Sequence, residues 1–392
     1  MMLRSSLMMC VLSTAATAAS TARFISKWSA WVVVPGAVGR RMSYEARMSD
    51  VRGGEGPKKI VFLGTPDVAA RSLELLVGAS RGGRGGGFEI VRVVSNPPAR
   101  AGRKKILQPS PVQALAENEG IPVMTPTSAR DEGFLLELEE LRPDLCVTAA
   151  YGQFLPQRFL DIPTLGTLNV HPSLLPHYRG ASPVQRCVEM GDTETGVTVA
   201  FTVLKMDAGP IVRQTVRKLN GDEKTPELLL SLFEEGTEQL IDCLPLVWDG
   251  SIKTRPQDDE AATKARKITV EEARCCFKTN SAFTIHNKVR AFAGWPGTWA
   301  LLSSGEGKDA EPNKVKLVTT EIGKENPDGG DSSKNIVLRN GALEIQCGDG
   351  SVLRVLELQP PGRKVMDAKS FVNGLRGAQL TWVELEPLVP TG

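Results

Sequence analysis

Polar residues that could do chemistry stand at the end of an apolar, strand-like run in the middle of the chain. Within the run TLNVHP, Asn169 and His171 are two residues apart, and in a strand such residues project from the same face. Pro172 then ends the run, because proline cannot donate to a strand ladder. Ligands of open α/β sheets bind beyond the carboxyl ends of strands, which makes the pair a candidate site. Two satisfied polar residues at a strand terminus are the alternative, and the spacing alone leaves both readings open.

A third candidate is Asp207, which ends a strand-like run in LKMDAGP just before a glycine turn. A carboxylate beside an imidazole orients the ring and favours its charged form, and an asparagine amide can donate to a developing oxyanion. Asn169, His171 and Asp207 therefore indicate acyl transfer without a nucleophilic side chain. An aspartate before Ala-Gly more commonly begins a turn, and sequence spacing does not show that Asp207 reaches His171.

The elements that would position these residues follow an alternating pattern over residues 58–250. An apolar strand at 60–63, a glycine turn and a helical pattern open this region, and further strands and helices follow to about residue 190. An antiparallel hairpin is expected over 195–212 and a helix over 226–244. The alternation predicts an α/β domain with a Rossmann-like, mostly parallel sheet. Gly64 stands alone and Pro66 follows it, so a dinucleotide cradle is rejected.

The rest of the chain indicates a second domain. Residues 251–267 are polar and without periodicity, which predicts a linker. Over 268–392, a helix is followed by short strands with Asn-Gly and Asp-Gly turns, a pattern typical of a small, OB-like β-barrel. Trp295 and Trp299 are expected to be core residues rather than base-stacking platforms.

The first 57 residues differ in composition from the rest. Basic residues lie among Ser, Thr, Ala and Met, and no acidic residue precedes Glu45. This composition is typical of an organelle transit peptide, with a secretory signal as the alternative. We expect the mitochondrial matrix, with the chloroplast stroma as the alternative. No run approaches the length of a membrane span.

Cysteine spacing argues against a metal-binding or disulfide-rich protein, and the net charge gives no sign of general nucleic-acid binding. The seven cysteines show no metal-ligand spacing, so no metal and no disulfide framework are expected, as in a reducing compartment. Residues 1–57 carry seven of the 47 basic and three of the 45 acidic residues, which leaves 40 basic and 42 acidic residues, a net charge of −2. Any RNA binding must therefore come from a local patch.

Extended segments of the chain resemble the folate-dependent formyltransferases. The segment NVHPSLLPHYRGASPVQ, with the later LKMDAGP, is similar to that family's Asn-x-His-x-Ser-Leu-Leu-Pro and Asp-x-Gly signature. The segments IVFLGTPDVAARSLELL, AYGQFLP, RAFAGWPGTW and LQPPGRK resemble the branch that acts on initiator methionyl-tRNA. The resemblance runs from about residue 58 to residue 377.

The resemblance implies roles for matching residues. Asn169 would bind the formyl oxygen, His171 would take part in proton transfer, and Asp207 would orient His171. Ser173, Leu174, Leu175 and Pro176 match the segment that contacts tetrahydrofolate. The formyl group would pass from 10-formyltetrahydrofolate to the methionine α-amine without a covalent enzyme intermediate.

The resemblance also implies a tRNA-binding loop in NPPARAGRKK, with Arg103 matching its main arginine and Lys104 and Lys105 beside it. The family usually has Pro-Asp-Arg-Pro-Ala-Gly-Arg there, whereas this chain reads NPPARAGR and lacks the aspartate and its contacts. The expected partners are initiator methionyl-tRNA and formyl-folate, with no membrane, and the expected state is a monomer.

Other functions remain as alternatives. One is formyl transfer to a small amine, such as glycinamide ribonucleotide or an amino sugar nucleotide, or hydrolysis of the formyl donor. Another is a non-enzymatic RNA-binding protein. The second domain and the basic loop argue against the first, and the presence of all three candidate residues argues against the second.

Overall fold

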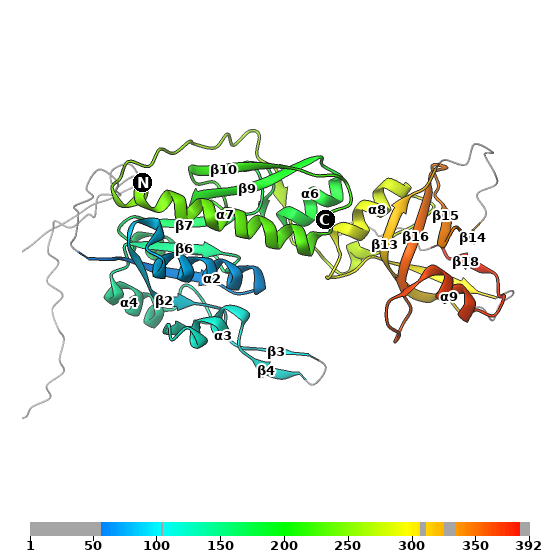
Figure 1. Cartoon of the computed structure of the whole chain (residues 1–392), viewed down its shortest axis with the longest axis horizontal. Helices are drawn as coiled ribbons and strands as arrows, with labels where there is room; N and C mark the ends of the chain where they lie inside the picture. Colours follow the sequence, from blue (N-terminus) through cyan, green and yellow to red (C-terminus); the bar gives the residue numbers. More distant parts are fainter. Residues whose placement is uncertain (1–55, 103–104, 306–310, 325–333, 385–392) are drawn as a thin grey trace, which may run out of the picture. The chain divides into compact units, whose positions relative to one another are not determined.

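The computed structural model describes residues 56–102, 105–305, 311–324 and 334–384. Residues 1–55 of the predicted transit peptide (residues 1–57) lie outside these residues. In the part described, no helix is both long enough and apolar enough to cross a membrane. The described residues form an α/β region followed by a β-barrel, as the sequence predicts (Figure 1).

The α/β region is built on a mixed sheet of seven strands, in the order β10-β9-β7-β6-β1-β2-β5. Five neighbouring strands, from β7 to β5, run parallel, while β9 is antiparallel to both β7 and β10. The predicted hairpin is thus confirmed as β9 and β10. The strands are β1 (Lys58–Gly64), β2 (Phe88–Val94), β5 (Val123–Met124), β6 (Leu145–Ala149), β7 (Thr167–His171), β9 (Glu194–Phe201) and β10 (Ile211–Lys218).

Helices cover both faces of this sheet, because alternate residues of the central strands are apolar on both sides. In β1, Ile60 and Phe62 pack with α2 and α7, whereas Val61 and Leu63 pack with α4 and α5. Cys146 of β6 is fully buried on the second face. The helices of this region are α2 (Asp67–Arg81), η1 (Arg84–Gly86), α3 (Pro111–Asn118), α4 (Glu132–Leu141), α5 (Gln157–Asp161), α6 (Pro183–Met190) and α7 (Thr225–Trp248).

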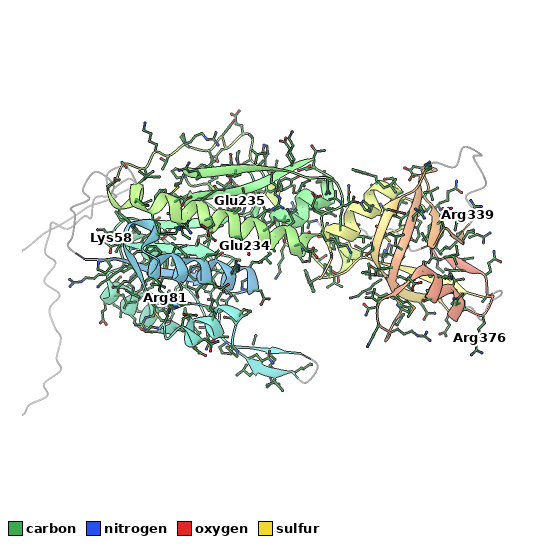
Figure 2. The ribbon with its side chains drawn as sticks, viewed as in Figure 1. Lys58, Arg81, Glu234, Glu235, Arg339 and Arg376 are labelled. Atoms are coloured by element: carbon green, nitrogen blue, oxygen red, sulfur yellow. The ribbon has the colours of Figure 1, made fainter. Side chains whose placement is uncertain are left out.

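Helix α7 lies close to the strands that carry the candidate site. At Gly236 the helix leaves so little room that an added Cβ would lie 2.4 Å from Val197 Cγ2 of β9 and 2.7 Å from Val170 Cγ1 of β7. The outer sides of α2 and α7 carry charged residues such as Arg81, Glu234 and Glu235 (Figure 2). Arg71 donates to Glu234 at 2.7 Å and so joins the two helices.

The second region is a closed barrel of six strands. The sheet order β13-β12-β18-β14-β15-β16-β17, with an added pairing of β13 to β16, closes the ring and leaves β17 at its edge. Its apolar interior includes Leu302, Val315, Leu353 and Val355. The elements are η2 (Glu271–Ala273), α8 (Ala282–Ala291), β12 (Trp299–Ser304), β13 (Asn313–Ile322), β14 (Asn335–Arg339), β15 (Ala342–Gln346), β16 (Val352–Gln359), β17 (Met366–Asp367), α9 (Ala368–Gly374) and β18 (Leu380–Trp382).

The two tryptophans expected in the core differ in their placement. Trp299 is partly buried and packs against the core of the α/β region. Trp295 is 56% exposed, so the prediction is wrong for this residue. Apolar content alone did not reveal that Trp295 lies in a tight turn between Gly294 and Gly297, both with positive φ, where its ring faces solvent.

Candidate active site at the carboxyl end of the sheet

The structure brings the three candidate residues together at one end of the sheet. Asn169 and His171 belong to β7, and His171 is its last residue. Asp207 follows β9, the antiparallel neighbour of β7, and the two strands place Asn169 opposite Ala200 and His171 opposite Thr198. His171 is buried, whereas Asn169 and Asp207 are partly exposed. The strand-end position inferred from Pro172 is therefore confirmed.

Thr148 orients the side chain of Asn169. It lies opposite Asn169 on β6, and its hydroxyl donates to Asn169 Oδ1 at 2.8 Å, with the Leu168 carbonyl oxygen 3.3 Å away. Because Thr148 occupies the amide oxygen, the Nδ2 group is the part of Asn169 that can donate to a ligand. Thr148 could not be found by sequence reasoning, since it belongs to another strand, 21 residues earlier.

One nitrogen of His171 is fixed by the main chain. Nε2 lies 3.0 Å from the carbonyl oxygen of Tyr178, and a carbonyl can only accept, so Nε2 carries a hydrogen. Nδ1 lies 3.8 Å from Asp207 Oδ1, which is too long for a direct hydrogen bond. In the neutral ring Nδ1 is therefore the acceptor, and a proton gained there would face the Asp207 carboxylate.

Asp207 is itself held by the loop beyond β7. Its Oδ2 accepts from the Gly180 backbone N–H at 2.8 Å, which leaves Oδ1 on the side of His171. The residue has a φ of 49°, in the left-handed region that a non-glycine residue adopts only where the surroundings hold it. The structure thus fixes both partners of the His171–Asp207 pair through residues 178–180.

Residues 173–176, predicted to contact folate, form a fixed turn. Ser173 is buried, its hydroxyl donates to the His177 carbonyl at 2.7 Å, and its own carbonyl accepts from Thr198 at 2.6 Å. Leu175 packs with Ala200 and Ile211. Leu174 and Pro176 are partly exposed, so these two side chains can still touch a ligand.

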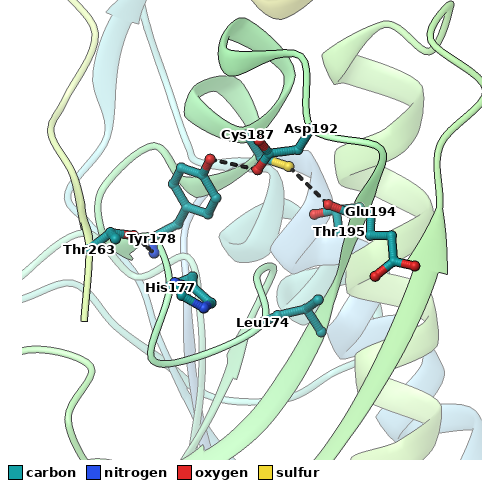
Figure 3. Close-up of a pocket in the computed structure, with 8 residues that line it drawn as sticks. All are labelled: Leu174, His177, Tyr178, Cys187, Asp192, Glu194, Thr195 and Thr263. Atoms are coloured by element: carbon teal, nitrogen blue, oxygen red, sulfur yellow. Dashed lines mark hydrogen bonds between the residues drawn. The ribbon is translucent and has the colours of Figure 1, made fainter. Parts of the chain in front are cut away.

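A pocket of about 230 Å³ lies beside this turn. Figure 3 shows its lining, in which Tyr178 donates to Asp192 Oδ2 at 2.6 Å. Burial, followed by this hydrogen bond, raises the pKa of Tyr178, and burial raises the pKa of Cys187 to about 12. Both groups therefore stay neutral at ordinary pH. The lining residues are Leu174, His177, Tyr178, Cys187, Asp192, Glu194, Thr195 and Thr263.

The loops after β1, β2 and β6 meet at the same end of the sheet. The Tyr151 carbonyl accepts from Thr65 Oγ1 and from Asn96 Nδ2, each at 3.0 Å. Gln153 donates to Asn96 Oδ1 at 2.7 Å and so extends the network. Burial raises the pKa of Tyr151 to about 12. Polar contacts between these loops therefore hold them together at the carboxyl end of the sheet, where the candidate residues lie.

The predicted tRNA-binding loop belongs to a hairpin of β3 (Ala99–Ala101) and β4 (Ile106–Gln108). Arg103 and Lys104 lie outside the described residues. Lys105 is exposed with a φ of 49°, and the next two side chains, Ile106 and Leu107, are 54% and 64% exposed. Across the described segments no group of three or more His, Cys, Asp or Glu side chains could hold a metal ion.

The fold and the site define an α/β protein with a candidate acyl-transfer site and a β-barrel, and comparison with known proteins gives the family. Residues 58–244 match the family model described as formyl transferase, and residues 267–376 match the model described as formyl transferase, C-terminal domain. The chain belongs to the formyl transferase family. It is similar to proteins named methionyl-tRNA formyltransferase, with 36% identity to that of Halalkalibacterium halodurans and 37% to that of Listeria innocua. The alignments cover 82% and 81% of this chain and 96% and 95% of those proteins.

Solved structures share the fold at lower identity. An N-formyltransferase from Helicobacter canadensis, in complex with folinic acid and dTDP-3-aminofucose, is 16% identical with a TM-score of 0.54, over 77% of this chain and 99% of that chain. HypX from Aquifex aeolicus, in complex with tetrahydrofolic acid, is 17% identical with a TM-score of 0.50, over 81% and 47%. Proteins that share this fold have thus been solved with folate compounds bound.

Proposed function

We propose that this chain transfers the formyl group of 10-formyltetrahydrofolate to the α-amine of initiator methionyl-tRNA. The observation that carries the proposal is the similarity, across both domains, to proteins named methionyl-tRNA formyltransferase. The placement of Asn169, His171 and Asp207 at one end of the sheet supports formyl transfer as the chemistry.

The proposed reaction uses the three residues in sequence. The methionine amine attacks the formyl carbon, and the carbonyl oxygen becomes an oxyanion that accepts from Asn169 Nδ2. The amine loses a proton, for which Nδ1 of His171 is the available acceptor, directly or through a water. Asp207, on the same side of the ring, stabilises the resulting imidazolium. The oxyanion then re-forms the carbonyl as the bond between the formyl carbon and N10 breaks, and N10 takes up the proton that His171 had received, directly or through a water.

The test is a formylation assay with the full chain, 10-formyltetrahydrofolate and charged initiator methionyl-tRNA. We expect formylmethionine on the charged tRNA and none with uncharged tRNA. Glycinamide ribonucleotide and an amino sugar nucleotide serve as parallel acceptors. Formylation of either one without formylation of methionyl-tRNA would support a small-amine transferase, and formate release without any acceptor would support a hydrolase.

The hairpin and the barrel are proposed to hold the tRNA. Lys105 with the exposed Ile106 and Leu107 offers a basic and apolar projection suited to a nucleic acid end. We predict that Arg103→Ala raises the KM for methionyl-tRNA severalfold, because a phosphate contact of this kind adds affinity without taking part in the chemistry. The KM for the formyl donor should stay unchanged, and equal effects on both substrates would contradict the assignment. Arg81→Ala, an exposed arginine at the end of α2 and outside this hairpin, is the matched control.

The location and oligomeric state are also proposals. The basic, acid-poor composition of residues 1–57 supports import into the mitochondrial matrix. Fused to a fluorescent protein, these residues should direct it to mitochondria, and accumulation in plastids or secretion would contradict this. We propose a monomer in solution, to be measured by light scattering during gel filtration.

A further inference from the structure

The segment between the two family domains runs along the candidate site. Arg255 and Ile211 exchange both backbone hydrogen bonds at 2.8 Å. Farther on, β11 (Lys264–Ala265) pairs with β8 (Arg179–Gly180) in a parallel ladder. We call residues 255–265 the strap. The strap therefore contacts both loops that hold His171 and Asp207: residues 176–180 and residues 205–209.

Gln257 is the residue of the strap that joins these two loops. Its Nε2 donates to the Asp207 carbonyl at 2.8 Å and to the Gly209 carbonyl at 2.7 Å. Its Oε1 accepts from Arg179 Nε at 3.0 Å and from Arg179 Nη2 at 2.7 Å. The amide thus uses both hydrogens and both lone pairs, which defines its position fully.

The bonds of Gln257 act where the candidate site is strained. Asp207 has a positive φ, and two hydrogen bonds hold the residue in this conformation. The Gly180 N–H donates to its side chain, and Gln257 donates to its carbonyl oxygen. Arg179 lies between Tyr178, whose carbonyl fixes His171, and Gly180, whose N–H fixes Asp207. Gln257 therefore bonds to Asp207 and to Arg179, whose two neighbours in the chain fix His171 and Asp207. These bonds help to set the distance of 3.8 Å between His171 Nδ1 and Asp207 Oδ1.

We propose that Gln257 is a positioning residue for formyl transfer, one that sets the His171–Asp207 geometry from within the strap. The proposal rests on the proposed function for its substrate, and on the four hydrogen bonds of the Gln257 side chain for its geometry. Gln257 has no role in contacting either substrate, because its amide is fully engaged with protein groups. It acts through Asp207, so its loss should lower kcat and leave the binding of methionyl-tRNA and the formyl donor unchanged.

The first variant is Gln257→Glu, which keeps the length and the acceptors for Arg179 but removes both donors. A carboxylate facing two carbonyl oxygens would push the loop at Asp207 away. We expect kcat to fall about 10²-fold, the loss typical of a misplacement of about 1 Å, with both KM values close to those of wild type. Gln257→Ala, which brings no new charge, should show the same fall in kcat.

The matched control is Asp259→Ala, on the same strap. Asp259 accepts from Arg179 Nη1 at 2.7 Å and from Lys205 at 2.5 Å, without contacting Asp207. A kcat close to wild type is expected for this variant. If it loses as much as Gln257→Glu, anchoring of Arg179 explains the effect and the proposal is overturned. Wild-type kcat in Gln257→Glu and Gln257→Ala would overturn it as well.

A second readout does not depend on the substrate. The chain has three histidines, His171, His177 and His286, so their imidazole signals can be resolved and assigned by NMR. Gln257→Glu should shift the signals of His171 and leave those of His286 in place, whereas Asp259→Ala should shift neither. Unchanged His171 signals would overturn the proposal even if methionyl-tRNA proves not to be the acceptor. Absence of tRNA formylation by wild type would count against the proposed function alone.

Discussion

His171 has one ring nitrogen engaged by the main chain, and this determines what the other can do. The Tyr178 carbonyl takes the Nε2 hydrogen, and Nδ1 is left on the side of Asp207. In Asn169, too, one polar atom is engaged by the protein and the other is available, since Thr148 donates to its oxygen and leaves its Nδ2 hydrogens for a ligand. In both side chains, therefore, one polar atom fixes the orientation through a hydrogen bond and the other is available for chemistry.

We predict that His171→Ala lowers kcat by about 10²–10⁴-fold, the range of a lost acid or base. His177→Ala is the matched control, because His177 is exposed and belongs to the same loop. Formylation rates at saturating tRNA and donor would measure the difference. Near-normal turnover of His171→Ala would remove this residue from the mechanism.

The sequence could predict the candidate residues but only part of what holds them. The spacing of Asn169 and His171 follows from strand geometry, and Pro172 marks the strand end. Thr148 and Gln257 could not be predicted, because their partners lie 21 and 50 residues away. The carbonyl of Tyr178 leaves no signature at all, since every residue type has one.

At the scale of elements, α7 packs against strands β7 and β9, which position the candidate residues. The alternation of strands and helices predicted this layer, and both the α/β class and the barrel are confirmed. Strand order and register could not be predicted from the sequence, because they depend on pairings between distant segments. The two-residue pair of β8 and β11 is too short for any periodicity to reveal.

We predict that Gly236→Ala destabilises the protein by about 1–3 kcal/mol, the cost typical of overpacking. The added Cβ would overlap Val197 and Val170, which belong to the strands that carry and flank the candidate residues. Denaturant unfolding followed by far-UV circular dichroism measures the change. Gly78→Ala is the matched control, because no atom lies within 4 Å of its added Cβ on the exposed side of α2. The control should be stabilised by about 0.5–1 kcal/mol. Equal shifts in both variants would show that the packing argument fails.

At the scale of the whole molecule, the two family domains share a hydrophobic core. Phe292 and Trp299 belong to the sequence matched by the C-terminal model, yet they pack with the apolar residues of α2, α7 and the large sheet. His286 of α8 likewise lies near the Gly221 carbonyl, at 3.3 Å from Nε2. Stability of the α/β region is therefore expected to depend on residues beyond its own family boundary.

We predict that Phe292→Ala weakens the α/β region by about 3–5 kcal/mol, because it empties a fully buried aromatic position. Hydrogen exchange measured by mass spectrometry should become faster in α7 as well as in α8. Leu353→Ala, inside the barrel, is the matched control and should affect barrel peptides alone. Faster exchange confined to residues 267–376 in the Phe292 variant would contradict the shared core.

The strap gives the chain a minimal active length that differs from its family boundary. A protein ended after α7 at Trp248 would keep Asn169, His171 and Asp207, and would lose Gln257, Thr263 and the pairing partner of Gly180. During synthesis on the ribosome, Gly180 would likewise lack its pairing partner until residue 265 has left the exit tunnel. Anyone who grafts this catalytic domain onto another carrier should therefore place the junction after Ala265, not at the end of the long helix.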